Sequence, residues 1–316
     1  MYNLGCYGYR FAQPILLTSK PCFAFLKCNT RKARIKHVNH MNSFPYKDVF
    51  LAVEKRLIEA GSKRMDKSRI QGHLDKFKRF ENRELTDDQY FSILVFVAFY
   101  SGFKAATVTS KRAVIQKHFP SWAAASAYAE NDIKNIIGDP EMISHEGKIR
   151  ACVANAKTFA ALISKHGSIK NYIDSYSPTE SFENLLLFKE ALEASFAYLG
   201  GITVYHFMTD IGLPVLKPDR VMSRIFERLG LLENQEQLLK TVIQGRKFAA
   251  ATGLPIRYID IVFVAYGQVK SEEMGIDEGI CLTKPRCAEC RIQDHCGFVA
   301  NAARQETLRD KTAQRP

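Results

Sequence analysis

Helical periodicity is the sequence feature that most restricts the fold of this 316-residue chain. From Tyr46 onward, apolar residues recur at the spacing of α-helices, and no segment shows the sustained alternation of a β-strand. Thr86 is a plausible N-cap for one of the expected helices. The predicted helices cover residues 46–61, 86–103, 105–118, 121–127, 130–137, 146–166, 184–198, 203–211, 219–230, 236–247 and 257–269. The sequence therefore predicts an all-α body.

The net charge of +12 is unevenly distributed along the chain. Residues 1–47 contain eight Lys or Arg and no Asp or Glu, which leaves 37 basic and 33 acidic residues in the remainder. A body that is this mildly basic is compatible with nucleic acid binding but does not require it. The longest apolar run, residues 91–103, is shorter than a bilayer-spanning helix, so no membrane partner is expected.

The first 40 residues lack the periodicity of the body and the apolar core of a secretory signal. Three interpretations remain open: a disordered basic arm, an organelle-targeting segment, or sequence upstream of a true start at Met41. Cysteines outside the C-terminal region are Cys6, Cys22, Cys28 and Cys152. They form no visible disulfide framework, which favours a reducing compartment, the cytoplasm with its nucleoid, unless the extension directs the chain to an organelle.

Four of the eight cysteines lie within 16 residues, in the segment CLTKPRCAECRIQDHC. Cys281, Cys287, Cys290 and Cys296 form the pattern C-x5-C-x2-C-x5-C, and thiolates group in this way to bind a soft metal centre. Four-cysteine zinc sites usually combine two separate C-x2-C pairs. One central pair flanked by single cysteines favours a [4Fe–4S] cluster, with zinc or free thiols as alternatives.

Basic residues lie among these cysteines, at Lys284, Arg286 and Arg291. A loop fixed by a metal centre can hold such side chains against DNA phosphates, and Lys284 and Arg286 are the predicted contacts. The alternative is a structural loop with solvated charges.

A helical hairpin is predicted around the segment FAYLGGITVYHFM. One helix ends near Leu199, Gly200 and Gly201 form a turn, and a second helix begins near Thr203. Paired glycines permit positive φ, and backbone N–H groups at a helix N-terminus bind anions such as a DNA phosphate. An ordinary helix cap is the alternative.

Asp219 follows Pro218 and precedes the amphipathic segment RVMSRIFERLG. Aspartate is a good N-cap, and this local role alone would explain the residue. The same position favours an ionised carboxylate, which is suited to stabilise a developing sugar cation or to orient a water molecule.

The hairpin, the aspartate and the four-cysteine loop, in this order, resemble the helix-hairpin-helix DNA glycosylase superfamily, which includes endonuclease III and the mismatch-specific adenine glycosylase. The resemblance extends from about residue 88 to residue 296. It implies a two-lobed helical fold with a six-helix lobe at 86–205, a second lobe at 48–85 plus 206–300 that carries the iron–sulfur loop, and flanking segments at 1–47 and 301–316. It also implies that Asp219 is catalytic, and that Leu199, Gly200, Gly201 and Thr203 contact DNA.

The middle of the chain also resembles the 3-methyladenine glycosylase I branch, through MISHEGKIRACVANAKTF and LGGITVYHFM. Where that branch has its base-recognising Glu and Trp, this chain has Val97 and Ala105, so the same recognition of 3-methyladenine is not expected. Aromatic residues near these positions either stack on a flipped base or belong to the core; they are Phe99, Tyr100 and Phe103.

Bifunctional members of the superfamily place a Schiff-base lysine just after the hairpin glycines, where this chain has Ile202. Neither Lys189 nor Lys217 occupies that place, so no AP-lyase activity is expected. Tyr205 and His206 are interpreted as packing or backbone contacts, and Trp122 as a core residue.

The resemblance thus implies a monomeric, monofunctional DNA glycosylase that acts on double-stranded DNA in base excision repair. Three alternatives stay open: a glycosylase for hypermodified bases in defence or base modification, a catalytically inert iron–sulfur DNA-binding protein, and a helical interaction protein stapled by zinc.

Overall fold

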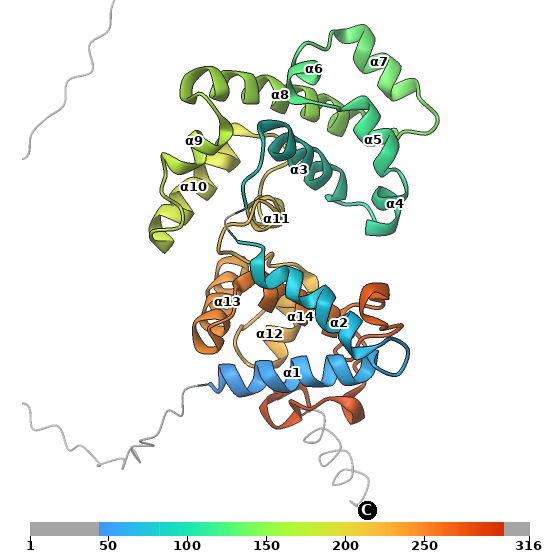
Figure 1. The fold of residues 1–316 in the computed structure, drawn as a ribbon, viewed down its shortest axis with the longest axis vertical. Coiled ribbons are helices and arrows are strands. Elements are labelled where there is room, and N and C mark those ends of the chain that lie inside the picture. Colours follow the sequence, from blue (N-terminus) through green and yellow to red (C-terminus); the bar gives the residue numbers. More distant parts are fainter. Residues whose placement is uncertain (1–43, 82, 300–316) are drawn as a thin grey trace, which may run out of the picture. The chain divides into compact units, whose positions relative to one another are not determined.

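The computed structural model of the protein describes residues 44–81 and 83–299, and this part of the chain is helical, as predicted (Figure 1). The described residues form no strand; one isolated bridge pairs Ser271 with Ile276. Most of the basic extension and the whole tail at 301–316 lie outside the described residues, so the interpretations of these segments stay predictions.

The helices pack in two groups. The first group contains α3 (Asp87–Tyr100), α4 (Ala105–Ser110), α5 (Arg112–His118), α6 (Trp122–Ser126), α7 (Glu130–Gly138), α8 (Glu146–His166), α9 (Ile169–Asp174), α10 (Phe182–Ser195) and α11 (Ile202–Asp210). The second group contains α1 (Tyr46–Gly61), α2 (Lys67–Asp75), α12 (Arg220–Arg228), α13 (Leu238–Thr252) and α14 (Ile256–Gly267). Because α11 packs on α3 and α10, the expected boundary between residues 205 and 206 falls inside a helix of the first group.

Local sequence signals account for most of these helices. Thr86 caps α3 through a capping box, in which its hydroxyl accepts from the backbone of Gln89 and the Gln89 side chain accepts from the backbone of Thr86. The single helix expected at 105–118 is two helices, α4 and α5, which meet at Lys111. Helices α2 and α9 were not expected, because α2 buries only two residues and α9 is only six residues long.

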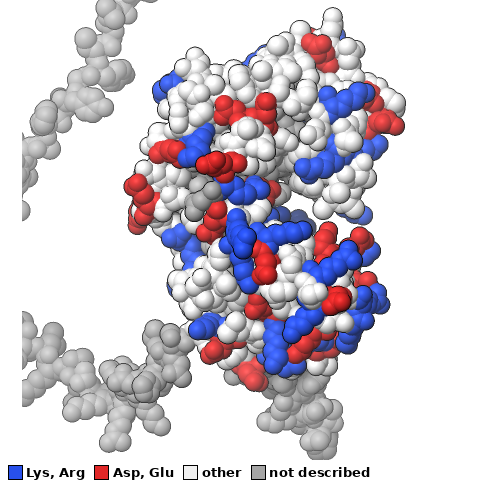
Figure 2. Space-filling view, in the orientation of Figure 1, with Lys and Arg blue, Asp and Glu red and all other residues white. Residues whose placement is uncertain are grey.

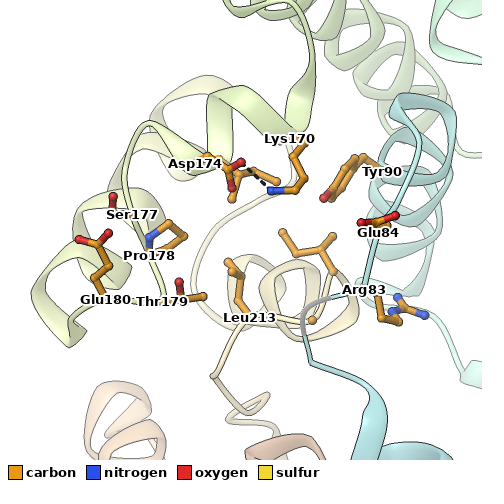
Figure 3. Close-up of a pocket in the computed structure, with 13 residues that line it drawn as sticks. Arg83, Glu84, Tyr90, Lys170, Asp174, Ser177, Pro178, Thr179, Glu180 and Leu213 are labelled. Carbon is orange, nitrogen blue, oxygen red and sulfur yellow. Dashed lines mark hydrogen bonds and ion pairs between the residues drawn. The ribbon is translucent and has the colours of Figure 1, made fainter.

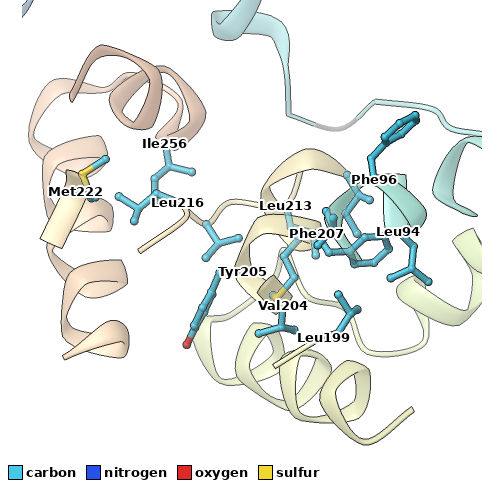
Figure 4. Packing of buried hydrophobic residues seen from close by; sticks show 14 of the residues in the cluster. Leu94, Phe96, Leu199, Val204, Tyr205, Phe207, Leu213, Leu216, Met222 and Ile256 are labelled. Carbon is cyan, nitrogen blue, oxygen red and sulfur yellow. The ribbon is translucent and has the colours of Figure 1, made fainter. Parts of the chain in front are cut away.

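The linker between the two helix groups, residues 211–219, is firmly packed. Leu216 is fully buried and lies beside Met222 and Ile256 (Figure 4). It also lies against Gly245 of α13, where an added Cβ would come within 1.9 Å of the Leu216 side chain. The linker thus fixes the point at which α12 begins, with its N-cap Asp219 three residues after Leu216.

Within residues 44–81 and 83–299, no single helix is both long and apolar enough to cross a bilayer. Only α13 and α14 together meet the length and composition required, and they are bent by 111° relative to each other.

Candidate active site at the start of helix α12

A cavity of about 620 Å³ lies beside the first turn of α12. It is bounded by the end of α3, the start of α4 and α5, one face of α11, the linker, and α14. The lining residues are Tyr100, Ser101, Gly102, Phe103, Ala105, Arg112, Ile202, Thr203, His206, Asp210, Lys217, Asp219 and Arg257. The cavity therefore brings Asp219 together with two of the three aromatic residues and with part of the hairpin selected from the sequence.

Asp219 caps α12 and also lines this cavity. Its Oδ1 accepts hydrogen bonds from the backbone N–H groups of Val221, at 2.9 Å, and Met222, at 3.1 Å. Its Oδ2 lies 3.5 Å from Nζ of Lys217. The cap uses Oδ1 alone and leaves Oδ2 for other contacts, so the capping role and a role in the cavity are compatible.

A second set of charged groups lines the cavity around His206. Nε2 of His206 lies 3.2 Å from Oδ2 of Asp210, and Oδ1 of Asp210 lies 3.2 Å from Nη2 of Arg257. Burial alone would raise the pKa of Asp210, but the hydrogen bond from His206 and the nearby positive charges together lower it. His206 therefore does more than pack, which corrects the interpretation from the sequence.

Behind these groups lies Asp260, which is buried and receives a 2.5 Å hydrogen bond from Nη1 of Arg257. Burial raises the pKa of Asp260, and the negative charge of Asp219 contributes to the same shift. Arg257 thus joins two carboxylates at one wall of the cavity. This group could not be predicted from the sequence, because Arg257 and Asp260 lie on α14, 38 or more residues after Asp219.

The three aromatic candidates differ in position. Tyr100 and Phe103 are half-buried and line the cavity, and the Tyr100 ring centre lies 6.0 Å from that of His206. Phe99 does not line the cavity: its side chain is fully buried, and its ring lies 6.4 Å from that of Phe119. Adjacent residues of a helix point in different directions, so Phe99 and Tyr100 cannot both face the same space.

Lys148 holds the turn that carries the cavity aromatics. Its Nζ donates to the carbonyl oxygens of Ala98, at 2.5 Å, and Ser101, at 2.7 Å. It also lies 4.4 Å from the ring centre of Tyr198, just before the hairpin. Burial lowers the pKa of Lys148. One buried side chain therefore links the end of α3 with the hairpin.

The hairpin glycines include the positive φ expected of such a turn, but their backbone N–H groups already have hydrogen-bond partners within the protein. Gly201 has φ +56°, and Gly200 N–H donates to Oγ1 of Thr203 at 2.9 Å. Gly201 N–H donates to a carboxylate oxygen of Glu193 at 3.1 Å, while the side chain of Leu199 is buried. A phosphate that binds at Gly201 would have to displace the carboxylate of Glu193.

The cysteine loop is tied to the second helix group by donors to its sulfurs. Arg228 of α12 donates from Nη1 to Sγ of Cys281 at 3.2 Å, and the Tyr266 hydroxyl donates to Sγ of Cys290, also at 3.2 Å. Burial raises the pKa of Cys287, and the negative charges of Cys290 and Cys296 contribute. Two of the four cysteines are thus held against α12 and α14.

In the described part of the chain, no three His, Cys, Asp or Glu residues form a group that could hold a metal ion.

The two basic residues predicted to bind DNA from this loop differ in whether their charge is paired within the protein. Lys284 is exposed, and no carboxylate of the described residues pairs with it. Arg286 pairs with Glu278 and Glu289, so its guanidinium is already engaged within the protein.

Basic and acidic side chains are interspersed over the face drawn in Figure 2, with a band of Lys and Arg across its middle.

A second cavity of about 380 Å³ lies between α9 and the start of the linker. There Lys170 and Asp174 pair at 2.6 Å (Figure 3). None of the residues predicted for the active site lines that cavity.

The profile of the methyladenine glycosylase family matches residues 80–192. Among solved structures, 3-methyladenine DNA glycosylase I from Staphylococcus aureus is 19% identical over 44% of this chain and 84% of its own, with a TM-score of 0.37. The 8-oxoguanine DNA glycosylase of Thermotoga maritima is 18% identical over 69% of this chain and 95% of its own, with a TM-score of 0.45. A Methanocaldococcus jannaschii 8-oxoguanine glycosylase/lyase, solved with DNA containing 8-oxoguanine, is 16% identical over 66% and 94%, with a TM-score of 0.45. The profile match identifies residues 80–192 as a segment related to the methyladenine glycosylases, which confirms the resemblance to DNA glycosylases predicted from the motifs.

Proposed function

We propose that the protein is a DNA N-glycosylase of base excision repair, which flips one nucleotide of a duplex into the cavity beside α12 and hydrolyses its N-glycosidic bond. The observation that carries the proposal is the position of Asp219. Its carboxylate is fixed by two backbone N–H groups and lines a cavity that also contains Tyr100 and Phe103. Enzymes that act on a base inside a duplex must extrude it into such a pocket, where aromatic side chains stack on it.

Asp219 supplies the negative charge that the reaction requires. As the bond to the base breaks, positive charge develops on the sugar, and a preorganised carboxylate stabilises it. Asp219 also accepts a proton from the water that adds to C1′. The products are the free base and an abasic site.

The proposed enzyme is monofunctional. Ile202, at the position of the Schiff-base lysine in bifunctional relatives, lines the cavity and has no nucleophilic atom. Lys217 also lines the cavity, but its Nζ pairs with Oδ2 of Asp219. This pairing holds the amine beside the carboxylate, and Lys217 lies on the linker rather than directly after the hairpin glycines.

The four cysteines are proposed to hold a [4Fe–4S] cluster. The support is the spacing of the cysteines, a central C-x2-C pair flanked by single cysteines within 16 residues, which suits the four corners of a cubane. Thiolate ligands of a cluster carry negative charge and are stabilised by hydrogen-bond donors. Arg228 and Tyr266 already donate to two of the four sulfurs. When bound, the cluster would brace the loop that presents Lys284.

A screen for base release tests the proposed function. Purified protein and its Asp219→Asn variant are incubated with duplexes that carry uracil, alkylated purines, oxidised pyrimidines, mismatches or modified cytosines. We expect alkali-labile sites in at least one duplex with the wild-type protein and few with the variant. Binding without release from any duplex would instead support an inert DNA-binding protein.

Anaerobic purification tests the cluster separately. We expect iron and visible charge-transfer absorbance in the wild-type protein, and loss of both in Cys290→Ser. Stoichiometric zinc without this absorbance would refute the cluster.

A further inference from the structure

We propose that His206 is a second catalytic residue, which donates a proton to the departing base, and that the substrate is therefore a base that is uncharged before it leaves. This inference rests on the proposed glycosylase function and names the substrate class of that site. It is carried by the side chains that His206 meets in the cavity.

His206 is held by a carboxylate on its own helix. It lies four residues before Asp210 on α11, so the two side chains share one face, with Nε2 3.2 Å from Oδ2. Asp210 is fixed in turn by Arg257, and its backbone carbonyl accepts a 2.5 Å hydrogen bond from Arg83. His206 lines the cavity, and no described residue forms a hydrogen bond with its Nδ1. A carboxylate bonded to one imidazole nitrogen fixes the orientation of the ring and with it that of the other nitrogen.

The side chains that line the cavity carry more positive than negative charge, while Asp260 lies behind them with a pKa that burial raises. Three cationic side chains line the cavity, those of Arg112, Lys217 and Arg257, and two carboxylates, those of Asp210 and Asp219. A proton on His206 would add a further positive charge. A base that leaves without a proton takes the bonding electron pair and becomes an anion, which this wall stabilises. An N-alkylated purine cation would instead be repelled here, and it needs no proton donor, because the bond to its sugar is already weakened by its own charge.

The proposed step balances as follows. The bond between C1′ and the base nitrogen breaks, and its electron pair stays on the base. The His206 imidazolium transfers a proton to a ring nitrogen or a carbonyl oxygen of the base. Water adds to C1′ and gives a proton to Asp219. Solvent then returns one proton to His206 and removes one from Asp219.

The test compares two kinds of leaving base under single-turnover conditions. The first is the neutral base that the screen above finds to be released fastest; the second is 7-methylguanine, a cationic purine. Wild type, His206→Gln and Asp210→Asn are measured on both duplexes. General acid catalysis typically contributes 10²–10⁴-fold. We expect His206→Gln to slow release of the neutral base by about 10²-fold or more, and to change any release of 7-methylguanine by less than about threefold.

The chain provides a matched control. His118 forms a similar pair with Asp139, with Nε2 2.7 Å from Oδ2, but neither residue lines the cavity. His118→Gln should leave both release rates unchanged, and thermal unfolding shows whether each variant is folded.

Three outcomes overturn the inference while the glycosylase function stands: wild-type release of cationic bases alone, equal losses on both duplexes in His206→Gln, or neutral-base release within threefold of wild type in that variant. Release from no duplex overturns the proposed function, and the inference with it.

Discussion

Replacement of Asp219 by asparagine separates the two roles that the structure gives this residue. Asparagine keeps a side-chain oxygen in the position that accepts from Val221 and Met222, and Asn and Asp are similarly good N-caps. The variant loses the negative charge in the cavity and the pairing with Lys217. Charge at a helix N-terminus contributes about 0.3–1 kcal/mol, so the free energy of unfolding should fall by no more than about 1 kcal/mol.

The rate of base release should fall much further. Removal of one preorganised group that stabilises transition-state charge typically lowers the rate by about 10²–10³-fold, or about 2.7–4 kcal/mol. The affinity for duplex DNA should stay the same or increase, because one negative charge near the phosphates is removed. Single-turnover release measures the first effect, and fluorescence anisotropy with a labelled duplex measures the second.

Ser181→Ala is the control for an effect of capping alone. Ser181 caps α10, where its hydroxyl accepts from the backbone of Asn184, and it does not line the cavity. Its loss should lower stability by about 1 kcal/mol and leave release unchanged. If Asp219→Asn released base within threefold of the wild-type rate, the catalytic assignment would be refuted, and Asp219 would be only a helix cap.

Three further predictions concern lysines and one cysteine. Borohydride should trap no covalent adduct between the wild-type protein and abasic DNA; an adduct that disappears in Lys217→Ala would contradict a monofunctional enzyme. Lys148→Met leaves the carbonyls of Ala98 and Ser101 without their donor, so urea unfolding should show a loss of about 2–5 kcal/mol. Burial raises the pKa of Cys152 to about 12, so mass spectrometry should find it unalkylated by iodoacetamide at pH 8 in the native protein and alkylated after denaturation.

The fold was predictable because its signals are local. A capped, periodic segment such as the one after Thr86 identifies a helix without reference to the rest of the chain. The phase of α3 was not predictable, since nearly all of its last eight residues are apolar and buried. Hydrophobicity therefore could not show that Tyr100 faces the cavity while Phe99 faces the core.

The site was predictable only where one short segment carries the chemistry. Asp219 could be recognised as a helix cap from the residues next to it. Arg257, in contrast, reaches the cavity through the tertiary packing of α14. His206 and Asp210 lie four residues apart on one helix, and this spacing was the signal available in the sequence. Glu193 illustrates the opposite problem, because a motif that predicts a free anion site cannot show which acid occupies it.

The position of Asp219 depends on a contact that the proposed chemistry does not use. A Cβ at Gly245 would lie 1.9 Å from Cδ2 and 2.7 Å from Cγ of Leu216, three residues before the catalytic carboxylate. Gly245→Ala should therefore displace the linker, lower stability by about 1–3 kcal/mol and slow base release, since a shift of about 1 Å at a catalytic group can reduce a rate 10²-fold.

A second substitution shows whether this effect passes through the linker. Leu216→Ala removes the two atoms that the new Cβ would meet, so adding it to Gly245→Ala should restore much of the lost rate, even though Leu216→Ala alone leaves a cavity. Gly72→Ala is the matched control, because no atom lies within 4 Å of its added Cβ in α2. Two results would refute this role of the linker. The first is that Gly245→Ala slows base release no more than Gly72→Ala does. The second is that the double variant loses as much rate as the two single substitutions together.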